Sequence, residues 1–195
     1  FGNLGCLVCY DVNFPEVTRC LALNGAEVFL HISSEGRSSY HLPNGGWELA
    51  RRVRAYENLA YLAMSNCGPT IDGEGPSDMS HGHSQVIDFE GQVLNMAESA
   101  GETMITAQID IEALRRRRAR ASLNFLAELS PQIHAPMYAQ ARAWPANHWL
   151  AQPGTGVADN RAVEAEVIAD MTRDGVLVAP SRADAEGAGR LAQQE

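Results

Sequence analysis

The chain contains no lysine, because all fifteen of its basic residues are arginine, and its 195 residues carry a formal net charge of −9. Binding to nucleic acid requires a basic surface, so this charge argues against a nucleic-acid partner. No stretch approaches the ~20 consecutive apolar residues that span a bilayer, so we expect no membrane partner either. The composition, 45% hydrophobic and 20% charged, is that of an ordinary globular protein.

Cysteine is also scarce. Four cysteines are too few to form a disulfide scaffold in a chain of this length, which favours a reduced, cytoplasmic setting. The sequence shows no secretory signal, but it opens with Phe1 inside a strand-like segment. We therefore expect an amino-terminal part of the protein, with any targeting signal, to be missing.

In the first third of the chain, short apolar runs alternate with segments in which apolar residues have helical spacing. Residues 4–9, 26–32 and 60–66 are predicted to be buried strands, and the segments after Pro15 and Trp47 to be helices, the first capped by Asn13. This order indicates an α/β layer structure. Further along, residues 83–97 predict a hairpin, residues 103–110 another strand and residues 111–121 a helix.

The carboxyl-terminal third shows weaker patterns. We assign residues 1–130 to one domain and residues 131–195 to an extension in which Trp144 and Trp149 pack, with a small, polar final stretch expected to be disordered. The arginine run 115–118 follows Asp110, a good helix cap. We expect it to lie on a solvated or interface helix rather than in a phosphate-binding patch.

Cys6 and Cys9 form a C-x-x-C motif, which is compatible with metal binding or redox chemistry. Residues three apart in a strand point to opposite faces, so these two thiols would be unable to share a metal or close a disulfide. His81 and His83 could join a metal site, but a structural role suits such a pair better. We therefore predict no metal and no cofactor.

A role as a single nucleophile suits Cys9 better than metal binding or redox chemistry. A sharp exit from a strand exposes a side chain and aims the next backbone N–H at the same point, as in a nucleophile beside an oxyanion hole. A cysteine thiolate is a strong nucleophile even when sparsely populated at neutral pH. The residues alone leave the alternative that Cys9 is a small buried hydrophobe equally open.

Three segments resemble the nitrilase superfamily of carbon–nitrogen hydrolases. They read "GCLVCYDVNFPEVTRCLALNGAEVFL", "RRVRAYENLAYLAMSNCG" and "GHSQVIDFEGQVL", and the likeness extends from about Gly2 to Arg120. The resemblance implies that the chain is the carboxyl-terminal portion of a four-layer α-β-β-α sandwich. It also implies hydrolysis of a small-molecule amide or nitrile through a cysteine thioester, in a homo-oligomer.

Within this resemblance, Cys9 matches the catalytic cysteine and the backbone N–H of Tyr10 matches the oxyanion donor. Glu16, Arg54 and Glu57 match motif positions of the family, and we interpret them as bracing the cysteine loop or helix contacts, with ordinary helix-surface charges as the alternative. The loop of residues 33–47, just after His31, borders the pocket in the family arrangement.

The family triad also needs a glutamate and a lysine that precede the cysteine. Only eight residues precede Cys9, and none of them is either type. Arginine is a poor substitute for that lysine. We therefore expect this chain alone to be inactive as an incomplete fragment of an active enzyme. The rival hypotheses are a non-catalytic pseudoenzyme or interaction subunit and a thiol redox protein built on the C-x-x-C motif.

Overall fold

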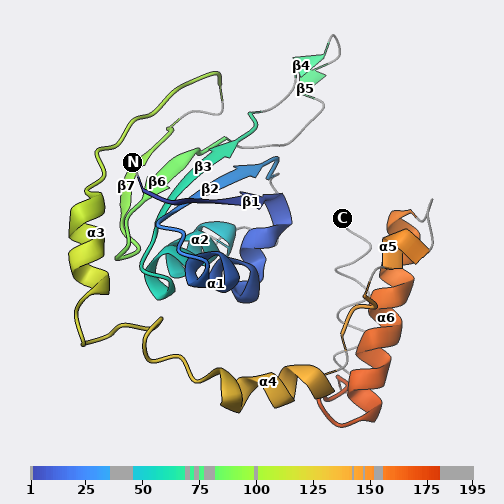
Figure 1. Ribbon diagram of the computed structural model, residues 1–195. Coiled ribbons are helices and arrows are strands. Elements are labelled where there is room, and N and C mark those ends of the chain that lie inside the picture. Colours follow the sequence, from blue (N-terminus) through green and yellow to red (C-terminus); the bar gives the residue numbers. More distant parts are fainter. Residues whose placement is uncertain are drawn as a thin grey trace. The chain divides into compact units, whose positions relative to one another are not determined.

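The computed structural model describes residues 2–35, 46–68, 71–72, 75–76, 82–98, 101–141, 143–146, 148–151 and 156–180. The chain divides into two compact units, Phe1–Leu129 and Ser130–Glu195. The first is an α/β unit (Figure 1). Its elements are β1 (Leu4–Val8), the 3-10 helix η1 (Cys9–Asn13), α1 (Pro15–Leu23), β2 (Val28–Ser33), α2 (Gly46–Glu57), β3 (Tyr61–Asn66), β4 (Ile71–Asp72), β5 (Gly75–Pro76), β6 (Gln85–Ile87), β7 (Val93–Met96) and α3 (Ile111–Arg118).

The larger sheet has five strands in the order β1-β2-β3-β6-β7. Strands β1, β2 and β3 are parallel, and their pairing places Val8 beside Ile32 and Ser33 beside Asn66. The carboxyl ends of these three strands therefore meet at one edge of the sheet, which is where α/β proteins commonly place their sites. Strands β6 and β7 complete the sheet as the predicted antiparallel hairpin.

One face of the sheet carries the core. Alternate residues of β1 and β2 are buried there, including Leu7 and Phe29, and they form one cluster with Leu62 and Ile87 from β3 and β6. Helices α1 and α2 lie on this side of the sheet (Figure 1), and α1 ends at Leu23, just before Gly25, whose φ of +94° prevents the helix from continuing. Burying this apolar face is what fixes the register of the strands.

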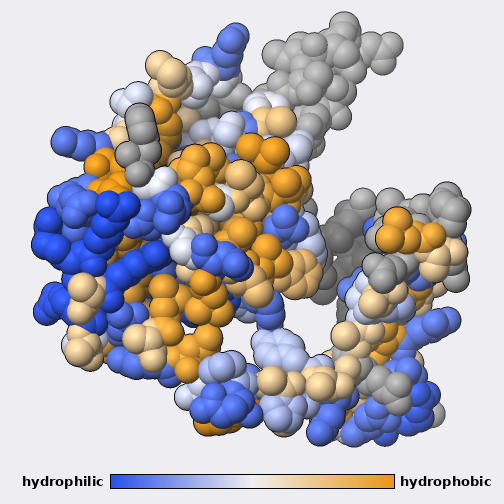
Figure 2. Space-filling view, viewed as in Figure 1, coloured by the Kyte–Doolittle hydropathy of each residue, from blue (hydrophilic) through white to orange (hydrophobic). Residues whose placement is uncertain are grey.

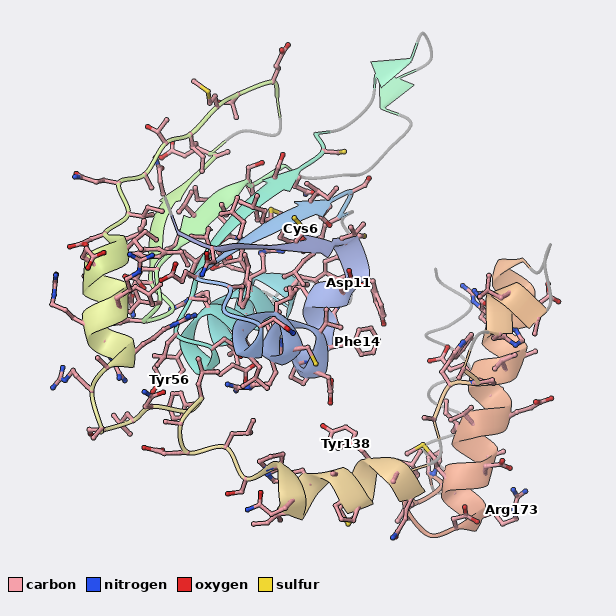
Figure 3. The ribbon with its side chains drawn as sticks, in the orientation of Figure 1. Cys6, Asp11, Phe14, Tyr56, Tyr138 and Arg173 are labelled. Carbon is pink, nitrogen blue, oxygen red and sulfur yellow. The ribbon has the colours of Figure 1, made fainter. Side chains whose placement is uncertain are left out.

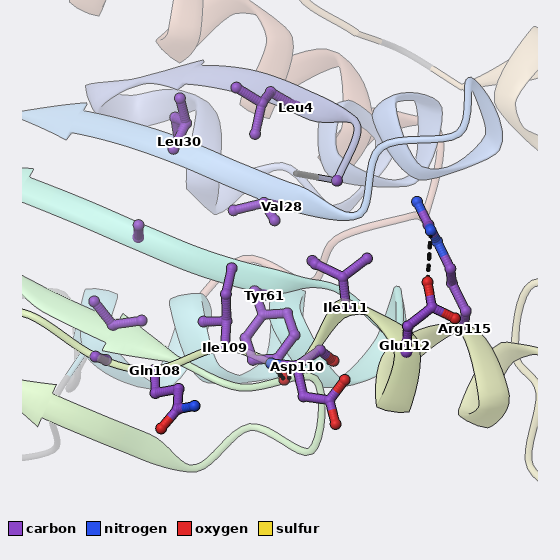
Figure 4. A pocket seen from close by; sticks show the side chains of 14 residues that line it. Leu4, Val28, Leu30, Tyr61, Gln108, Ile109, Asp110, Ile111, Glu112 and Arg115 are labelled. Carbon is purple, nitrogen blue, oxygen red and sulfur yellow. Dashed lines mark hydrogen bonds and ion pairs between the residues drawn. The ribbon is translucent and has the colours of Figure 1, made fainter.

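The opposite face of the sheet is open and apolar. Leu4, Val8, Leu30 and Ile32 point to this side and are all exposed, and Figure 2 shows hydrophobic surface gathered over these strands. A groove of about 850 Å³ lies on the same face between the strands and residues 107–112 (Figure 4). Contiguous apolar surface of this kind marks a site of packing or binding.

The arginine run fastens α3 to the sheet. Asp110 caps α3 as predicted, accepting a hydrogen bond from the Ala113 N–H at 2.8 Å. Arg115 pairs with the buried Glu27 at 2.7 Å. Arg118 turns inward and donates to the carbonyls of Leu59 and Ala26 at 2.8 and 2.6 Å. Arg118 thus satisfies backbone carbonyl groups inside the unit. The interpretation of the run as a solvated or interface helix therefore holds only for those arginines that face outward.

Two local predictions are wrong. Residues 103–110 form no strand, because their backbone joins no ladder, and Thr106 instead accepts a hydrogen bond from the Asn95 side chain at 2.9 Å. Asn13 does not cap α1. Phe14 occupies the cap position, and the Asn13 side chain donates back to the Tyr10 carbonyl at 3.3 Å. Pro15 at the first helical position sets the start of α1 without a side-chain cap.

The second unit contains three helices among its described residues: α4 (Pro131–Gln140), α5 (His148–Ala151) and α6 (Val157–Arg173). The Trp144 ring contacts His148 edge-on, with ring centroids 5.7 Å apart. The Trp149 side chain and the end of the chain from residue 181 lie outside the described residues. Across the described parts of both units, no helix is long and apolar enough to cross a membrane.

Candidate active site at the end of β1

Cys9 follows directly on the last residue of β1 and opens η1 (Figure 3, where Cys6 and Asp11 mark the strand and the turn). Its backbone has a φ of +49°, a left-handed conformation that is uncommon for a residue with a side chain. Cys9 is partly exposed, whereas Cys6, Cys20 and Cys67 are exposed, and all four are free thiols. Cys9 therefore stands outside the strand, at a strained strand-to-helix turn of the kind that functional sites use.

The premise that Cys6 and Cys9 share a strand is wrong, since β1 ends at Val8. Cys6 lies within β1 and is exposed on the open face of the sheet. His83 is described, and His81 lies outside the described residues. Among the residues that the structure describes, no three histidine, cysteine or acidic side chains gather as metal ligands would.

Three side chains hold the backbone of this turn. Asp11 accepts a hydrogen bond from the Val8 N–H at 2.9 Å. His31 lies on β2 with its Nε2 atom 3.0 Å from the Cys9 carbonyl oxygen. Arg54 reaches over from α2 and donates to the carbonyls of Val12 and Asn13 at 3.0 and 3.2 Å. The turn is thus fixed from β2 and from α2 as well as from within.

The structure brings together most of the sequence-predicted residues. Arg54, while bound to the η1 carbonyls, also pairs with Glu57 at 2.9 Å, so both lie next to the cysteine turn. Tyr10 is the second residue of η1, where helix geometry gives a backbone N–H no acceptor within the helix. Glu16 lies exposed in the first turn of α1. The catalytic and bracing roles of these residues stay predictions.

A buried ion pair lies beside the turn, and sequence reasoning missed it. Glu35, just beyond β2, and Arg51 of α2 are 3% and 2% exposed, and their side chains are 2.6 Å apart. With its amide oxygen turned toward Arg51, Gln85 of β6 accepts two further hydrogen bonds at 2.8 and 2.7 Å. Burial of both charges is tolerated because each is paired and hydrogen-bonded.

Asn66, at the end of β3, secures the start of the predicted pocket loop. Its side chain accepts from the Glu35 N–H at 2.7 Å and donates to the carbonyls of Glu35 and Gly82 at 3.2 and 2.8 Å. At the other end of that loop, Trp47 contacts the Tyr10 ring edge-on, with centroids 5.8 Å apart. Both ends of the loop therefore lie at the cysteine edge of the sheet, and residues 36–45 between them lie outside the described residues.

The electrostatics of the turn favour a neutral histidine. Burial lowers the pKa of His31, and the nearby Arg51 guanidinium lowers it further, against the opposing effects of the Cys9 carbonyl, Glu35 and Asp11. A neutral imidazole has one donor and one acceptor nitrogen. His31 therefore contributes a hydrogen bond to the turn without adding a charge.

Comparison with known proteins agrees with this geometry. The family model described as carbon–nitrogen hydrolase matches residues 1–119. Human deaminated glutathione amidase is 36% identical over 118 residues, which are 60% of this chain and 34% of that protein, so the chain spans about a third of its relative's length. A carbon–nitrogen hydrolase structure from Helicobacter pylori superposes with a TM-score of 0.59 at 28% identity, covering 70% of this chain and 49% of the other.

A further solved structure concerns cysteine chemistry directly. It is a glutamate-to-glutamine variant of the Nesterenkonia sp. AN1 amidase, 26% identical, with a TM-score of 0.52, covering 69% of this chain and 44% of the other. In that structure acrylamide has undergone Michael addition at the active-site cysteine. That amidase variant thus forms an adduct with an unsaturated amide at its active-site cysteine.

Proposed function

The chain belongs to the carbon–nitrogen hydrolase family, and on that premise we propose that it carries the nucleophile, Cys9, of an enzyme that hydrolyses small-molecule amides. The observation that carries this proposal is the position of Cys9, which stands at a strained turn where the parallel strands of the sheet end. The human and Nesterenkonia relatives are named amidases, which supports an amide substrate and an enzyme over a non-catalytic subunit.

In the proposed reaction the Cys9 sulfur attacks the amide carbon, and the C=O electron pair moves onto oxygen. The Tyr10 backbone N–H donates to this oxyanion. Collapse of the tetrahedral intermediate expels the nitrogen, which leaves as ammonia or an amine after taking up a proton, and leaves a thioester on Cys9. Water then attacks the thioester and releases the carboxylic acid and the free thiol.

The remaining catalytic groups are proposed to come from outside this chain. The family lysine has no counterpart here, since the chain contains no lysine, and Arg51 and Arg54 are already engaged with Glu35 and with η1. We propose that a second α/β layer brings the glutamate and the lysine and packs on the open sheet face, giving the four-layer sandwich. The exposed apolar side chains of β1 and β2 support this arrangement.

Two further proposals concern the setting. The enzyme is proposed to be a homo-oligomer, as the family resemblance implies. It is also proposed to act in the cytoplasm, an environment that suits four free thiols.

The proposal is tested by competition among the four thiols of one molecule. The chain is treated with limiting acrylamide, and the adduct on each cysteine is counted by peptide mass spectrometry, with the urea-unfolded chain as reference. Exposure alone predicts that Cys9 reacts last, because the other three cysteines are more exposed. We expect Cys9 to react first in the folded chain, because addition to acrylamide uses the thiol held by the turn and the Tyr10 N–H but not the lysine, and to lose this preference in urea. Labelling of Cys9 in last place would refute its role as the nucleophile.

Turnover is tested separately. We expect background ammonia release from simple amides by the chain, equal to that of its Cys9→Ala variant, because the lysine is absent. Release that depends on Cys9 would refute the proposal that groups outside the chain are required.

A further inference from the structure

His31 holds the cysteine turn from the neighbouring strand. Its Nε2 atom lies 3.0 Å from the Cys9 carbonyl oxygen, and the side chain is 1% exposed, so water does not compete for this contact. We propose that His31 is a positioning residue, which donates from Nε2 to the Cys9 carbonyl and maintains the backbone conformation that aims the thiol. This inference rests on the proposed function, because it takes Cys9 to be the nucleophile.

The geometry assigns the proton to Nε2. A carbonyl oxygen only accepts hydrogen bonds, so the nitrogen that faces it must carry a hydrogen. The other ring nitrogen, Nδ1, is buried and has no hydrogen-bond partner among the residues that the structure describes. A proton on Nδ1 would leave a buried N–H unsatisfied and would turn the Nε2 lone pair toward the carbonyl oxygen, and both results are unfavourable.

The surroundings keep the ring neutral. Arg51 approaches from α2, whereas Asp11 in η1 and Glu35 beyond β2 provide the opposite charge, and burial disfavours the imidazolium form. Glu35 is already committed to Arg51 at 2.6 Å. His31 thus acts as a neutral donor of fixed tautomer, held in a polar layer between the sheet and α2.

The conformation of Cys9 explains why such a donor is needed. A residue with a Cβ atom pays for φ values near +49° in steric strain, and it leaves them unless its surroundings hold it. Asp11 and Arg54 bind the turn at Val8, Val12 and Asn13, on either side of Cys9. His31 binds the carbonyl of Cys9 itself, so it controls the peptide plane between Cys9 and Tyr10, which also carries the Tyr10 N–H.

The tautomer is directly observable by NMR. Long-range ¹H–¹⁵N spectra of the chain at neutral pH distinguish the Nε2–H, Nδ1–H and doubly protonated forms of each of its six histidines. The His31 signals are assigned by their loss in His31→Gln. The neutral Nε2–H form would support the inference, and either of the other two forms would overturn it, whatever Cys9 does.

The positioning role is tested with two variants. His31→Gln keeps a donor nitrogen at the same distance along the side chain, and His31→Leu removes it. The readout is the ratio of acrylamide on Cys9 to acrylamide on Cys6 of the same molecule, with thermal unfolding measured for each protein. We expect the ratio to fall about tenfold in His31→Leu, as for a displaced reactive group, and to be largely retained in His31→Gln. His134→Leu, an exposed change on α4, is the matched control and should leave the ratio unchanged.

The outcomes separate the inference from the proposed function. If the unaltered chain shows no preference for Cys9, the proposed function fails, and the NMR result alone decides whether His31 holds the turn. If the preference is present and a folded His31→Leu protein keeps it, the positioning role is refuted. If His31→Leu does not fold, His31→Gln decides, and loss of the preference in that folded variant would contradict the inference.

Discussion

The buried Glu35–Arg51 pair should dominate the stability of the region around the cysteine turn. Removing Arg51 leaves the Glu35 carboxylate 3% exposed and unpaired, and breaking a buried pair in this way costs about 3–5 kcal/mol. Gln85 also loses both of its hydrogen bonds with Arg51, so Arg51→Met should lie at the upper end of that range. Since small domains have unfolding free energies of about 5–15 kcal/mol, a single substitution would remove a large fraction of the total.

The test is a double-mutant cycle on the free energy of unfolding in urea. We expect Arg51→Met and Glu35→Leu each to be strongly destabilising and the double variant to cost far less than their sum, because it leaves no buried charge behind. Arg116→Met is the matched control. Arg116 is exposed and its contact with Asp110 is long, at 3.4 Å, so this substitution should change the unfolding free energy little. Additive effects in the cycle, or a small effect of Arg51→Met, would refute the reasoning.

Three further substitutions test other parts of the fold by thermal or urea unfolding. Gly91→Ala should cost about 1–2 kcal/mol because of the left-handed backbone at Gly91. It should cost more than Gly175→Ala, because a Cβ at Gly91 would lie 3.1 Å from the Arg52 carbonyl, whereas a Cβ at Gly175 would meet open space. Equal costs would refute this steric contribution. Leu62→Ala, at a fully buried core position, should cost about 2–5 kcal/mol, against little for the exposed Leu23→Ala, and similar losses would contradict the assigned core. Arg115 holds the pKa of Glu27 in the folded chain below its usual 4.5. The stabilisation from this pair is therefore complete above pH 4.5 and is lost as the pH falls through the lower pKa of the folded chain. Glu27→Gln should accordingly make the unfolding free energy fall less steeply in acid. An unchanged acid transition would refute that assignment.

The sequence was a good guide wherever the structure depends on local patterns. The apolar runs predicted β1, β2 and β3, and the pattern of residues 83–97 predicted the β6–β7 hairpin, in which the Asp88 carboxylate accepts from the N–H groups of Glu90 and Gln92. Residues 103–110 were predicted as a strand yet form none, although β7 has a free edge, because the Asn95 side chain rather than a backbone ladder makes the contact to the Thr106 carbonyl. Whether a segment joins a sheet edge depends on the folded sheet and cannot be read from eight residues alone.

The candidate site was predictable only in its motif residues. Cys9 was a candidate from its position at the end of a strand as well as from the family resemblance, whereas Tyr10, Arg54 and Glu57 were candidates through the resemblance alone. His31, Glu35 and Arg51 look in the sequence like a strand residue, a loop charge and a helix-surface charge. They come together because parallel pairing aligns the ends of β1, β2 and β3 and because α2 packs at that edge of the sheet. The resulting contacts link parts of the chain as distant in sequence as Cys9 and Gln85, so no local pattern predicts them.

The most direct test of the central claim asks whether Cys9 recognises an amide. The ratio of Cys9 to Cys6 modification is measured in the folded chain with acrylamide, which carries an amide group, and with dithiodipyridine, which carries no carbonyl. Our account predicts a clear excess at Cys9 with acrylamide and a much smaller one with the disulfide reagent, because the Tyr10 N–H stabilises the negative charge that develops on the amide oxygen, and the disulfide reagent has no such oxygen. The same ratio with both reagents would mean that Cys9 is merely an accessible thiol, and would contradict an amide-hydrolase site at the end of β1.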